Sequence, residues 1–421
     1  MTIHNFSNGV ALLISIYFLP EPGGGATAAL NRAKLLKNIG YNVFIICGFP
    51  AYPTGKLKDQ KYKGRLFYVE KIDEFTIIRL KLIALGHEGY LKRLIIFLNF
   101  VFVCILNLPR IIRITGKINI VYALAPILFS SIIGFFYSKI TKSFFIYDVP
   151  DLWPEELVAF RSRFSPIIFH IGKILSKAMY SSPDIIITIS SSAAEMIREY
   201  YRPNPPIYDL PIGFDPQSFQ YLEKRDSRNK LITDKVFPAQ FQGKFLIIYT
   251  GLISRAQKVE NLLKLARKLD GDPDIMILIV GDGEDRSNIE LETKNLKNVY
   301  LLPYQPRNVI PYIIYSSDLC SVLLSCEPIF EIAFPTKFYE YLACRKQILG
   351  ICKGEMANII NKFGIGCAVS ENDIDLLVPF IIRIKRIHSD LGVETKFDKA
   401  INEFSLENLS KRLNEILSKE M

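Results

Sequence analysis

Short apolar runs alternate with amphipathic stretches along most of the chain. In the N-terminal half the apolar runs predict strands and the amphipathic stretches predict helices. The expected strands are Ala11–Leu19, Asn42–Cys47, Thr76–Leu80, Ile118–Ala123, Ser143–Asp148 and Asp184–Ile189, and the expected helices include Ala26–Asn38, Pro126–Lys139 and Ser191–Tyr201. Such alternation is typical of parallel α/β architecture.

A proline-rich stretch, Tyr201–Phe219, and a polar segment to Gly243 interrupt this pattern before it restarts. The later strands are expected at Lys244–Tyr249, Asp274–Val280, Val299–Leu302, Leu319–Leu324 and Gln347–Gly350, and Phe397–Met421 predicts one charged amphipathic helix. The 421 residues exceed one ordinary core. We therefore expect two doubly wound domains, with ligands bound at the carboxyl edges of their sheets. The expected ranges are 1–210, a linker 211–243, 244–396, and a helix 397–421 that packs back toward the first domain.

Charge separates the two halves. The chain has 52 Lys and Arg against 42 Asp and Glu, a net charge of +10. Residues 1–210 hold 24 basic and 14 acidic residues, whereas residues 211–421 hold 28 of each. The first half therefore predicts an anionic partner, such as a membrane surface or a phosphorylated substrate. A nucleic-acid partner is not expected, because the basic residues are scattered among apolar runs and form no aromatic-basic platform.

The cysteines indicate a reducing compartment. None of the seven forms a C-x-x-C pair, and most lie in apolar runs, where a free cysteine behaves as a small hydrophobe. Met1–Val10 lacks the positive region of a cleavable signal. We therefore expect a cytoplasmic protein.

One apolar stretch suggests contact with a membrane. Leu94–Leu106 is flanked by Lys92 and Arg93 on one side and by Arg110 and Arg113 on the other. As a helix its 13 residues rise about 20 Å, less than the roughly 30 Å of a bilayer core. Two interpretations stay open: a helix lying in the membrane interface, and a buried helix of an α/β domain.

A glycine loop follows the first expected strand. Gly23, Gly25 and Ala28 fit G-x-G-x-x-A, but the second strand ends without the acidic residue that a dinucleotide ribose requires. An NAD site is therefore disfavoured. The loop still allows a ligand to approach the positive N-terminus of the helix from Ala26, and a tight turn without a ligand is the alternative.

The densest chemistry lies in Glu327–Gly350. Pro335 suits a helix start, Lys337 lies in its first turn, and Glu340 follows three residues later on the same face. A cation with first-turn amides can hold a pyrophosphate, while a carboxylate one turn on can accept both hydroxyls of a ribose. The pattern therefore favours a nucleoside diphosphate, although a surface ion pair would give the same spacing.

Six segments, spread in order over nearly the whole chain, carry a resemblance to a known family. They are YFLPEPGGGATAAL, GFPAYPTGKL, YDVPDLWPEE, YTGLISRAQKVENLL, VGDGEDRSNIE and FPTKFYEYLA. Together they resemble the retaining GT-B glycosyltransferases of family four, in particular the bacterial branch with L-fucosamine transferases of O-antigen and capsule assembly. The resemblance implies two Rossmann-like domains facing a cleft, a nucleotide-sugar donor, no cofactor and no metal.

The resemblance also implies roles for single residues. Glu340 would accept the ribose hydroxyls, and Arg255 and Lys337 would stabilise the departing diphosphate. The remaining donor-site residues would be Gly24, Gly25, Gly281, Gly283, Tyr304, Gln305, Pro335 and Thr336. Asp151 follows a strand end and is either the acceptor-side base or the N-cap of a helix near Pro154.

The chain departs from the family pattern at several positions. The second glutamate of the wider family falls on Ile332, with Glu331 one residue away. The family's arginine and lysine after the first strand of the C-terminal domain fall on Leu252 and Gln257, so Lys258 is a further candidate beside Arg255. None of the four histidines matches the family's catalytic histidine. Asp272 and Asp274 have D-x-D spacing, which we interpret as a turn and not as a metal site.

The resemblance predicts a metal-independent retaining glycosyltransferase of bacterial surface polysaccharide synthesis. Its donor would be a UDP-sugar, with an N-acetylated aminosugar as one candidate, and its acceptor a polyprenyl-pyrophosphate-linked saccharide. The enzyme would associate peripherally with the inner leaflet of the cell membrane. The alternatives are a GT-B sugar-nucleotide epimerase, an inactive GT-B binding protein and an NAD oxidoreductase.

Overall fold

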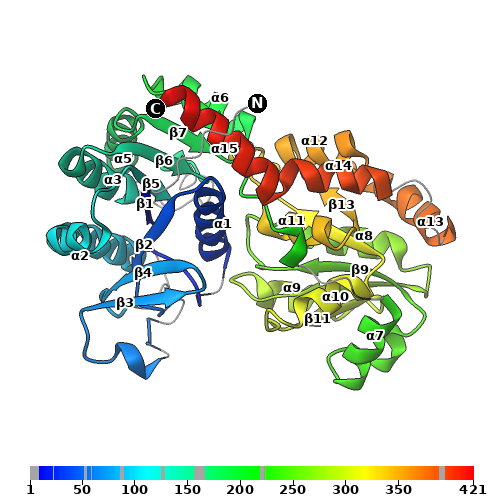
Figure 1. Cartoon of the computed structure of the whole chain (residues 1–421). Helices are drawn as coiled ribbons and strands as arrows, with labels where there is room; N and C mark the ends of the chain where they lie inside the picture. The colour runs from blue at the N-terminus through cyan, green and yellow to red at the C-terminus, as the bar shows by residue number, and fades with distance from the viewer. Residues whose placement is uncertain are drawn as a thin grey trace. The chain divides into compact units, whose positions relative to one another are not determined.

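The chain folds into two α/β units, each built on a parallel sheet (Figure 1). The computed structural model describes residues 9–21, 23–51, 55–57, 59–85, 90–124, 129–155, 166–218, 222, 224–387 and 394–421. The first unit is Met1–Gly213 with Leu406–Met421, and the second is Phe214–Ser405. The α/β class predicted from the alternating pattern is confirmed.

Over the described residues, the first unit contains an eight-stranded sheet in the order β3-β4-β2-β1-β5-β6-β7-β8. The strands are β1 Val10–Ile14, β2 Asn42–Gly48, β3 Phe67–Ile72, β4 Phe75–Leu80, β5 Ile120–Leu124, β6 Phe144–Val149, β7 Ile185–Thr188 and β8 Ile207–Asp209. Only β3 among them runs antiparallel to its neighbour. The first strand ends at Ile14, five residues earlier than expected, because the backbone from Ser15 turns into the loop before the first helix.

Helices cover both faces of this sheet. They are α1 Gly24–Asn38, α2 Tyr90–Thr115, α3 Phe129–Thr141, α5 Pro166–Tyr180, α6 Ser191–Tyr201 and α15 Leu406–Glu420. The crossovers through α2, α3, α5 and α6 advance across the sheet in one direction, whereas the crossover through α1 runs the other way. Because such crossovers are right-handed, α1 lies on the opposite face from those four helices.

The second unit contains a six-stranded sheet in the order β11-β10-β9-β12-β13-β14, whose neighbouring strands pair in parallel over the described residues. Its strands are β9 Phe245–Thr250, β10 Ile275–Val280, β11 Val299–Leu302, β12 Leu319–Leu323, β13 Gln347–Ile351 and β14 Gly366–Val369. Its helices are α7 Lys224–Thr233, α8 Glu260–Leu269, α9 Arg286–Thr293, α10 Ile310–Ser316, α11 Thr336–Ala343, α12 Gly354–Phe363, α13 Leu377–Ile387 and α14 Glu394–Phe404. Strands β9 and β10 are wholly buried, which explains their continuous apolar sequences.

Each sheet has a point where the strand order reverses. In the second unit β10 and β11 extend one way from β9, while β13 and β14 extend the other way from β12. In the first unit the reversal falls between β1 and β5. Ligands of doubly wound sheets bind at such points, outside the carboxyl ends of the strands. The loops after β9, β12 and β1 are therefore the places to search for a site.

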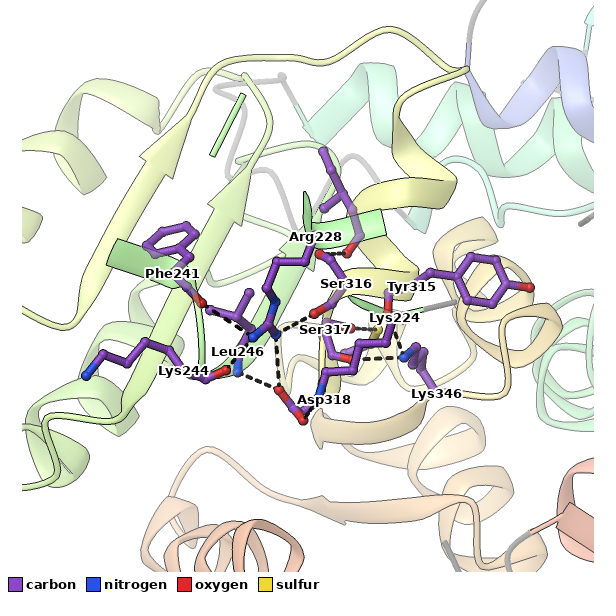
Figure 2. A network of polar contacts seen from close by, with 12 residues as sticks. Lys224, Arg228, Phe241, Lys244, Leu246, Tyr315, Ser316, Ser317, Asp318 and Lys346 are labelled. Atoms are coloured by element: carbon purple, nitrogen blue, oxygen red, sulfur yellow. Dashed lines mark hydrogen bonds and ion pairs between the residues drawn. The ribbon is translucent and has the colours of Figure 1, made fainter. Parts of the chain in front are cut away.

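Residues 211–243 were expected as a linker, but from Phe214 onward they belong to the second unit. Helix α7 lies within them and is fixed to the sheet by Arg228, as Figure 2 shows. The Arg228 guanidinium donates to the carbonyls of Lys244 at 2.8 Å and Ser316 at 2.6 Å and lies 3.5 Å from Asp318. Asp318 accepts in turn from the Leu246 amide at 2.8 Å. This polar segment therefore contains a helix that is anchored by a buried arginine.

The C-terminal stretch forms two helices instead of the single one expected. Helix α14 packs in the second unit, where Phe404 contacts Phe338 at 5.5 Å between ring centroids. The helical conformation is interrupted at Ser405. Helix α15 then packs against α1 of the first unit, where Asn38 donates to Ser410 at 3.1 Å. The last 16 residues therefore complete a unit that begins at the N-terminus.

Candidate functional site

Two loops meet at the reversal point of the second sheet. One follows β9 and spans residues 251–259, and the other follows β12 and spans residues 324–335. The Ser325 amide donates to the Ala256 carbonyl at 2.8 Å and so joins them. The sequence-predicted residues Arg255, Lys258, Glu331 and Pro335 lie on these two loops.

Glycines let a third loop pack against the first. A Cβ on Gly281 would lie 1.8 Å from the Gly251 carbonyl oxygen, and one on Gly283 would lie 2.1 Å from that of Ile253. The Ile253 amide donates to the Asp282 carbonyl at 2.9 Å across this contact. Gly281 and Gly283 are thus required by backbone packing, and their contact with a nucleotide remains a prediction.

Lys337 is the centre of this region. It lies in the first turn of α11, is nine-tenths buried, and donates from Nζ to Gln257 Oε1 at 2.8 Å. Its Nζ also lies 3.8 Å from the centroid of the Tyr249 ring, and the Tyr249 hydroxyl donates to the Leu252 carbonyl at 2.6 Å. Burial lowers the Lys337 pKa to about 7, partly offset by Glu340. A buried ammonium with no carboxylate bonded to it among the described residues is suited to receive an anion.

Glu340 lies one turn further along α11 and is half-buried. Burial raises the pKa of its carboxyl, while the charges of Arg307 and Lys337 act in the opposite direction. Arg307 belongs to the loop after β11, which places a second cation near this carboxylate. A half-buried carboxylate of this kind can accept hydrogen bonds from a pair of hydroxyls.

Arg255 is a second cation at the same edge. Its side chain is partly exposed and forms no hydrogen bond or ion pair with any residue in the described ranges. Lys258 differs, because it has a left-handed backbone conformation with φ 47° and an ion pair with Glu260 at 3.4 Å. Arg255 is therefore the better placed of the two to meet a diphosphate.

Ile332, which stands where the family has its second glutamate, is a buried residue in the structure. Ile332 is 5% exposed and packs as a core residue. Glu331 is partly exposed, and its backbone carbonyl accepts from the Glu355 amide at 2.7 Å at the start of α12. The close approach of Gly354, where a Cβ would lie 2.1 Å from that carbonyl oxygen, holds the Glu331 backbone in place.

The remaining predicted donor-site residues lie at the same edge. Tyr304 is 61% exposed after β11, and Gln305 donates to the Pro303 carbonyl at 3.2 Å. Pro335 precedes α11, whose first turn contains Thr336 and has no acidic residue and no side-chain cap. Amides at such an N-terminus favour an anion.

The glycine loop of the first unit leads into α1 from the reversal point of that sheet. Gly24 begins the helix, Gly25 follows, and both are exposed. Gly23 precedes them with φ 108°, a conformation that favours glycine, and the first turn has neither an acidic residue nor a side-chain cap. Beside the loop, Ile16, Phe49 and Ile96 line part of a small apolar cavity of about 60 Å³. The helix terminus is open to an anion, and the predicted role of Gly24 and Gly25 is untested.

Asp151 follows β6 at the carboxyl edge of the first sheet and is exposed. Its neighbours are buried: Trp153 is 8% exposed, and Glu155 accepts from the Tyr201 hydroxyl at 2.6 Å. The helix expected near Pro154 falls mainly outside the described residues, so the N-cap alternative stays open. The structure thus presents Asp151 to solvent while the rest of its motif anchors the loop.

The D-x-D motif is a turn with ion pairs. Lys385 donates to Asp272 at 2.6 Å, and Lys244 donates to Asp274 at 2.9 Å, just before β10. Within the ranges that the structure describes, no group of three or more His, Cys, Asp or Glu is arranged to hold a metal.

Sequence reasoning missed the residues that position Lys337. Tyr249 is the penultimate residue of β9, and Gln257 stands out in the sequence only as a departure from the family. Arg307 lies two residues after Gln305 and was not among the predicted residues. Only Arg307 had a visible signal, a cation directly after the Tyr304–Pro306 segment.

Comparison with known proteins finds a family match over most of the second unit. Residues 232–391 match the family model described as "Glycosyl transferases group 1". The putative colanic acid biosynthesis glycosyl transferase WcaI of Escherichia coli is 25% identical over 141 residues, which cover 32% of this chain and 34% of that protein. The alignment thus spans about a third of this curated relative.

Solved structures match over nearly the whole chain. The sucrose-phosphate synthase tll1590 of Thermosynechococcus elongatus has a TM-score of 0.72 and 16% identity, covering 98% of both chains. Anabaena Alr3699/HepE in complex with UDP has a TM-score of 0.67 and 14% identity, covering 98% of this chain and 100% of that one. The predicted GT-B fold is confirmed, while the retaining fucosamine-transferase branch stays a prediction. Residues 232–391 thus match the glycosyl transferases group 1 model, and the chain has a GT-B fold.

Proposed function

We propose that the protein is a glycosyltransferase that takes its sugar from a nucleoside diphosphate donor. The observation that carries the proposal is the edge of the second sheet, where the partly exposed Arg255 and the buried Lys337 lie on a loop and a helix that meet at the reversal point. Two cations and first-turn amides stabilise negative charge as it develops on a departing diphosphate. We propose that Glu340 accepts the ribose hydroxyls, because its half-buried carboxylate lies one turn after Lys337 on α11.

UDP is the favoured nucleotide. Alr3699/HepE, which has the same fold, was crystallised with UDP, and the predicted family branch also points to UDP. By analogy with WcaI we propose a role in polysaccharide synthesis. The acceptor we propose is a lipid-linked saccharide at the inner face of the cytoplasmic membrane, and the transfer proceeds with retention at the anomeric carbon. Proton NMR of the product's anomeric coupling tests the last point.

Titration calorimetry with UDP, GDP and NAD in metal-free buffer tests the donor site. We expect selective micromolar binding of UDP, and loss of at least about 100-fold in affinity in Glu340→Ala, because two hydrogen bonds to a charged group are removed. Glu292→Ala is the matched control, since Glu292 pairs with Arg267 on the exposed surface of α9 and α8. Unchanged affinity in Glu340→Ala refutes the ribose role, and binding of NAD alone refutes the transferase.

Asp151 is the proposed acceptor-side group, orienting or deprotonating the acceptor hydroxyl. Asp151→Asn keeps a good N-cap residue but removes the base. We expect turnover to fall by about 100-fold while the UDP dissociation constant stays unchanged. Near-normal turnover in this variant would return Asp151 to the N-cap role.

A further inference from the structure

The outer surface of three helices in the first unit is apolar and basic. Helix α2 has one buried side, with Phe100 and Cys104 in the core, and one exposed side. The exposed side carries a stripe with helical spacing, whose members are 38% to 68% exposed: Leu91, Ile95, Leu98, Phe102 and Leu106. Polar residues normally occupy this side of a surface helix. The stripe is therefore unexplained by packing within the fold.

The apolar surface continues onto the next two helices. Helix α3 exposes Phe136 and Ile140, and α5 exposes Ile171, Ile174 and Leu175. The three helices lie on the same face of the sheet, and Phe97 of α2 stacks on Phe129 of α3 at 6.1 Å. Figure 1 shows α2, α3 and α5 following one another on that side of the unit. Contiguous apolar patches are uncommon on soluble monomers and mark an interaction surface.

Charge identifies the occupant. The ranges of α2, α3 and α5 contain no Asp or Glu, and their basic residues are Lys92, Arg93, Arg110, Arg113, Lys139, Lys173 and Lys177. A second copy docked through this face would place like charges against each other. An anionic lipid surface satisfies both the charges and the apolar side chains.

Crossing of the membrane by α2 conflicts with its packing. Leu91–Thr115 is the helix that, in the described part of the chain, is long and apolar enough to span a bilayer. However, its inner side is part of the core, and the Tyr137 hydroxyl of α3 donates to the Cys104 carbonyl at 2.8 Å. Withdrawing α2 into a bilayer would expose that core, whereas lying flat leaves it intact.

We propose that α2, α3 and α5 form a membrane-docking face that binds anionic phospholipid, with the exposed stripe of α2 inserted at the headgroup boundary. This proposal rests on the proposed function and adds the lipid surface at which the acceptor is met. Helix α2 begins at the carboxyl edge of the sheet, where Asp151 and the glycine loop also lie. A lipid-linked acceptor held in the docked membrane then meets the first unit at its ligand edge. Leu94–Leu106 was interpreted from the sequence either as a buried helix or as a helix in the membrane interface. In this proposal each interpretation describes one side of α2: the inner side packs in the core, and the outer side lies in the membrane interface.

Vesicle flotation of the full chain tests this face. We expect flotation with vesicles of phosphatidylcholine and phosphatidylglycerol at roughly 7:3, weak flotation with phosphatidylcholine alone, and release as salt rises to about 0.5 M. The double variant Leu98→Gln/Phe102→Gln should bind at least about 10-fold more weakly, because apolar area is lost from the interface. Lys92→Gln/Arg113→Gln should bind roughly 5- to 25-fold more weakly on anionic vesicles only.

The controls carry the same changes elsewhere. Leu291→Gln replaces a 62% exposed leucine on α9, and Lys294→Gln/Lys297→Gln removes two exposed lysines of the second unit. These should float like the wild type. Circular dichroism confirms that every variant is folded.

Three results would overturn the docking face. The first is that the protein floats with neither kind of vesicle. The second is that Leu98→Gln/Phe102→Gln floats as well as the wild type. The third is that the wild type binds no vesicles but forms a dimer in light scattering, and that this variant abolishes the dimer. UDP titration on the same samples separates the two proposals. Retained UDP binding without vesicle binding removes the membrane face alone, whereas vesicle binding without UDP binding removes the donor site alone.

Discussion

At the residue scale, Lys337 links donor binding to pH. Burial lowers the Lys337 pKa to about 7, so the neutral amine predominates at pH 8. A diphosphate beside the ammonium raises this pKa, so binding at pH 8 takes up a proton. We therefore expect UDP titrations at pH 8, in buffers of different ionisation enthalpy, to show an uptake approaching one proton.

The direction in which UDP affinity changes with pH tests the role of Lys337. A cation whose pKa is lowered in the free state gains affinity for an anion as the pH falls toward 7, so UDP should bind more tightly at pH 7 than at pH 8.5. The variant Lys337→Gln should show weaker binding without proton uptake. Lys258→Gln is the matched control, because Lys258 pairs with Glu260 instead of facing Gln257. Equal proton uptake by the wild type and Lys337→Gln would contradict the role.

At the element scale, the loops after β9 and β10 pack closely because Gly281 and Gly283 have no side chains. Gly281→Ala places a Cβ within 1.8 Å of the Gly251 carbonyl oxygen, so the loops must separate. We expect a loss of about 2 kcal/mol or more in the free energy of unfolding, together with weaker UDP binding. Urea unfolding and calorimetry measure the two effects.

Gly271 provides the control for this substitution. A Cβ added at Gly271 would have no neighbouring atom within 4 Å, so Gly271→Ala should leave the unfolding midpoint and the UDP affinity unchanged. An equally stable Gly281→Ala protein would show that the two loops are more loosely packed than the structure indicates.

The anchor of α7 is a second prediction at this scale. Arg228→Met removes the buried partner of the Ser316 and Lys244 carbonyls and leaves Asp318 with fewer donors. We expect a loss of about 3 kcal/mol in the free energy of unfolding. Lys230→Met on the same helix removes an exposed pair with Asp234 and a cation–π contact with Tyr312, and should cost less than about 1 kcal/mol. Similar unfolding midpoints for the two variants would contradict the anchoring role.

Local pattern was sufficient for the buried strands and for the edge strand β11, but not for the other edges. Strands such as β9 and β10 are continuous apolar runs, which are readily predicted. The missed strands were β3, β8 and β14, all at a sheet edge: β3 and β14 are largely half-exposed, and β8 has three residues. Their short or mixed sequences lack the continuous apolar run of a strand that is buried on both faces.

The same limit applies to the site. Lys337 and Glu340 share a helix, so their spacing was readable from the sequence. The contact of Lys337 with Gln257, 80 positions away, depends on the sheet order and could not be read. Likewise, the helix break at Ser405 could not be predicted, because both flanking segments are amphipathic and only their packing partners differ.

At the scale of the whole molecule, the chain returns to its first unit for its last helix. Helix α15 buries Leu409, Leu413 and Leu417 and is tied to β8 by the Arg412–Asp209 ion pair at 3.1 Å. The second unit is one continuous segment, whereas the first is completed only when residues 406–421 are present. Substitutions in α15 should therefore change the stability of the first unit, whose other residues lie about 200 or more positions earlier in the chain.

The single tryptophan makes this prediction measurable. Trp153 is buried in the first unit, so its fluorescence reports the unfolding of that unit. Leu413→Ala should lower the urea midpoint seen by fluorescence, with a loss of about 2 to 5 kcal/mol. Leu265→Ala, at an equally buried position on α8 of the second unit, should leave that fluorescence midpoint unchanged while shifting the circular dichroism. UDP at about 100 times its dissociation constant should add about 2.7 kcal/mol to the stability of the second unit. If Leu265→Ala moves the Trp153 transition as far as Leu413→Ala does, the two units unfold as one cooperative block, and the division of the chain at Ser405 has no energetic meaning.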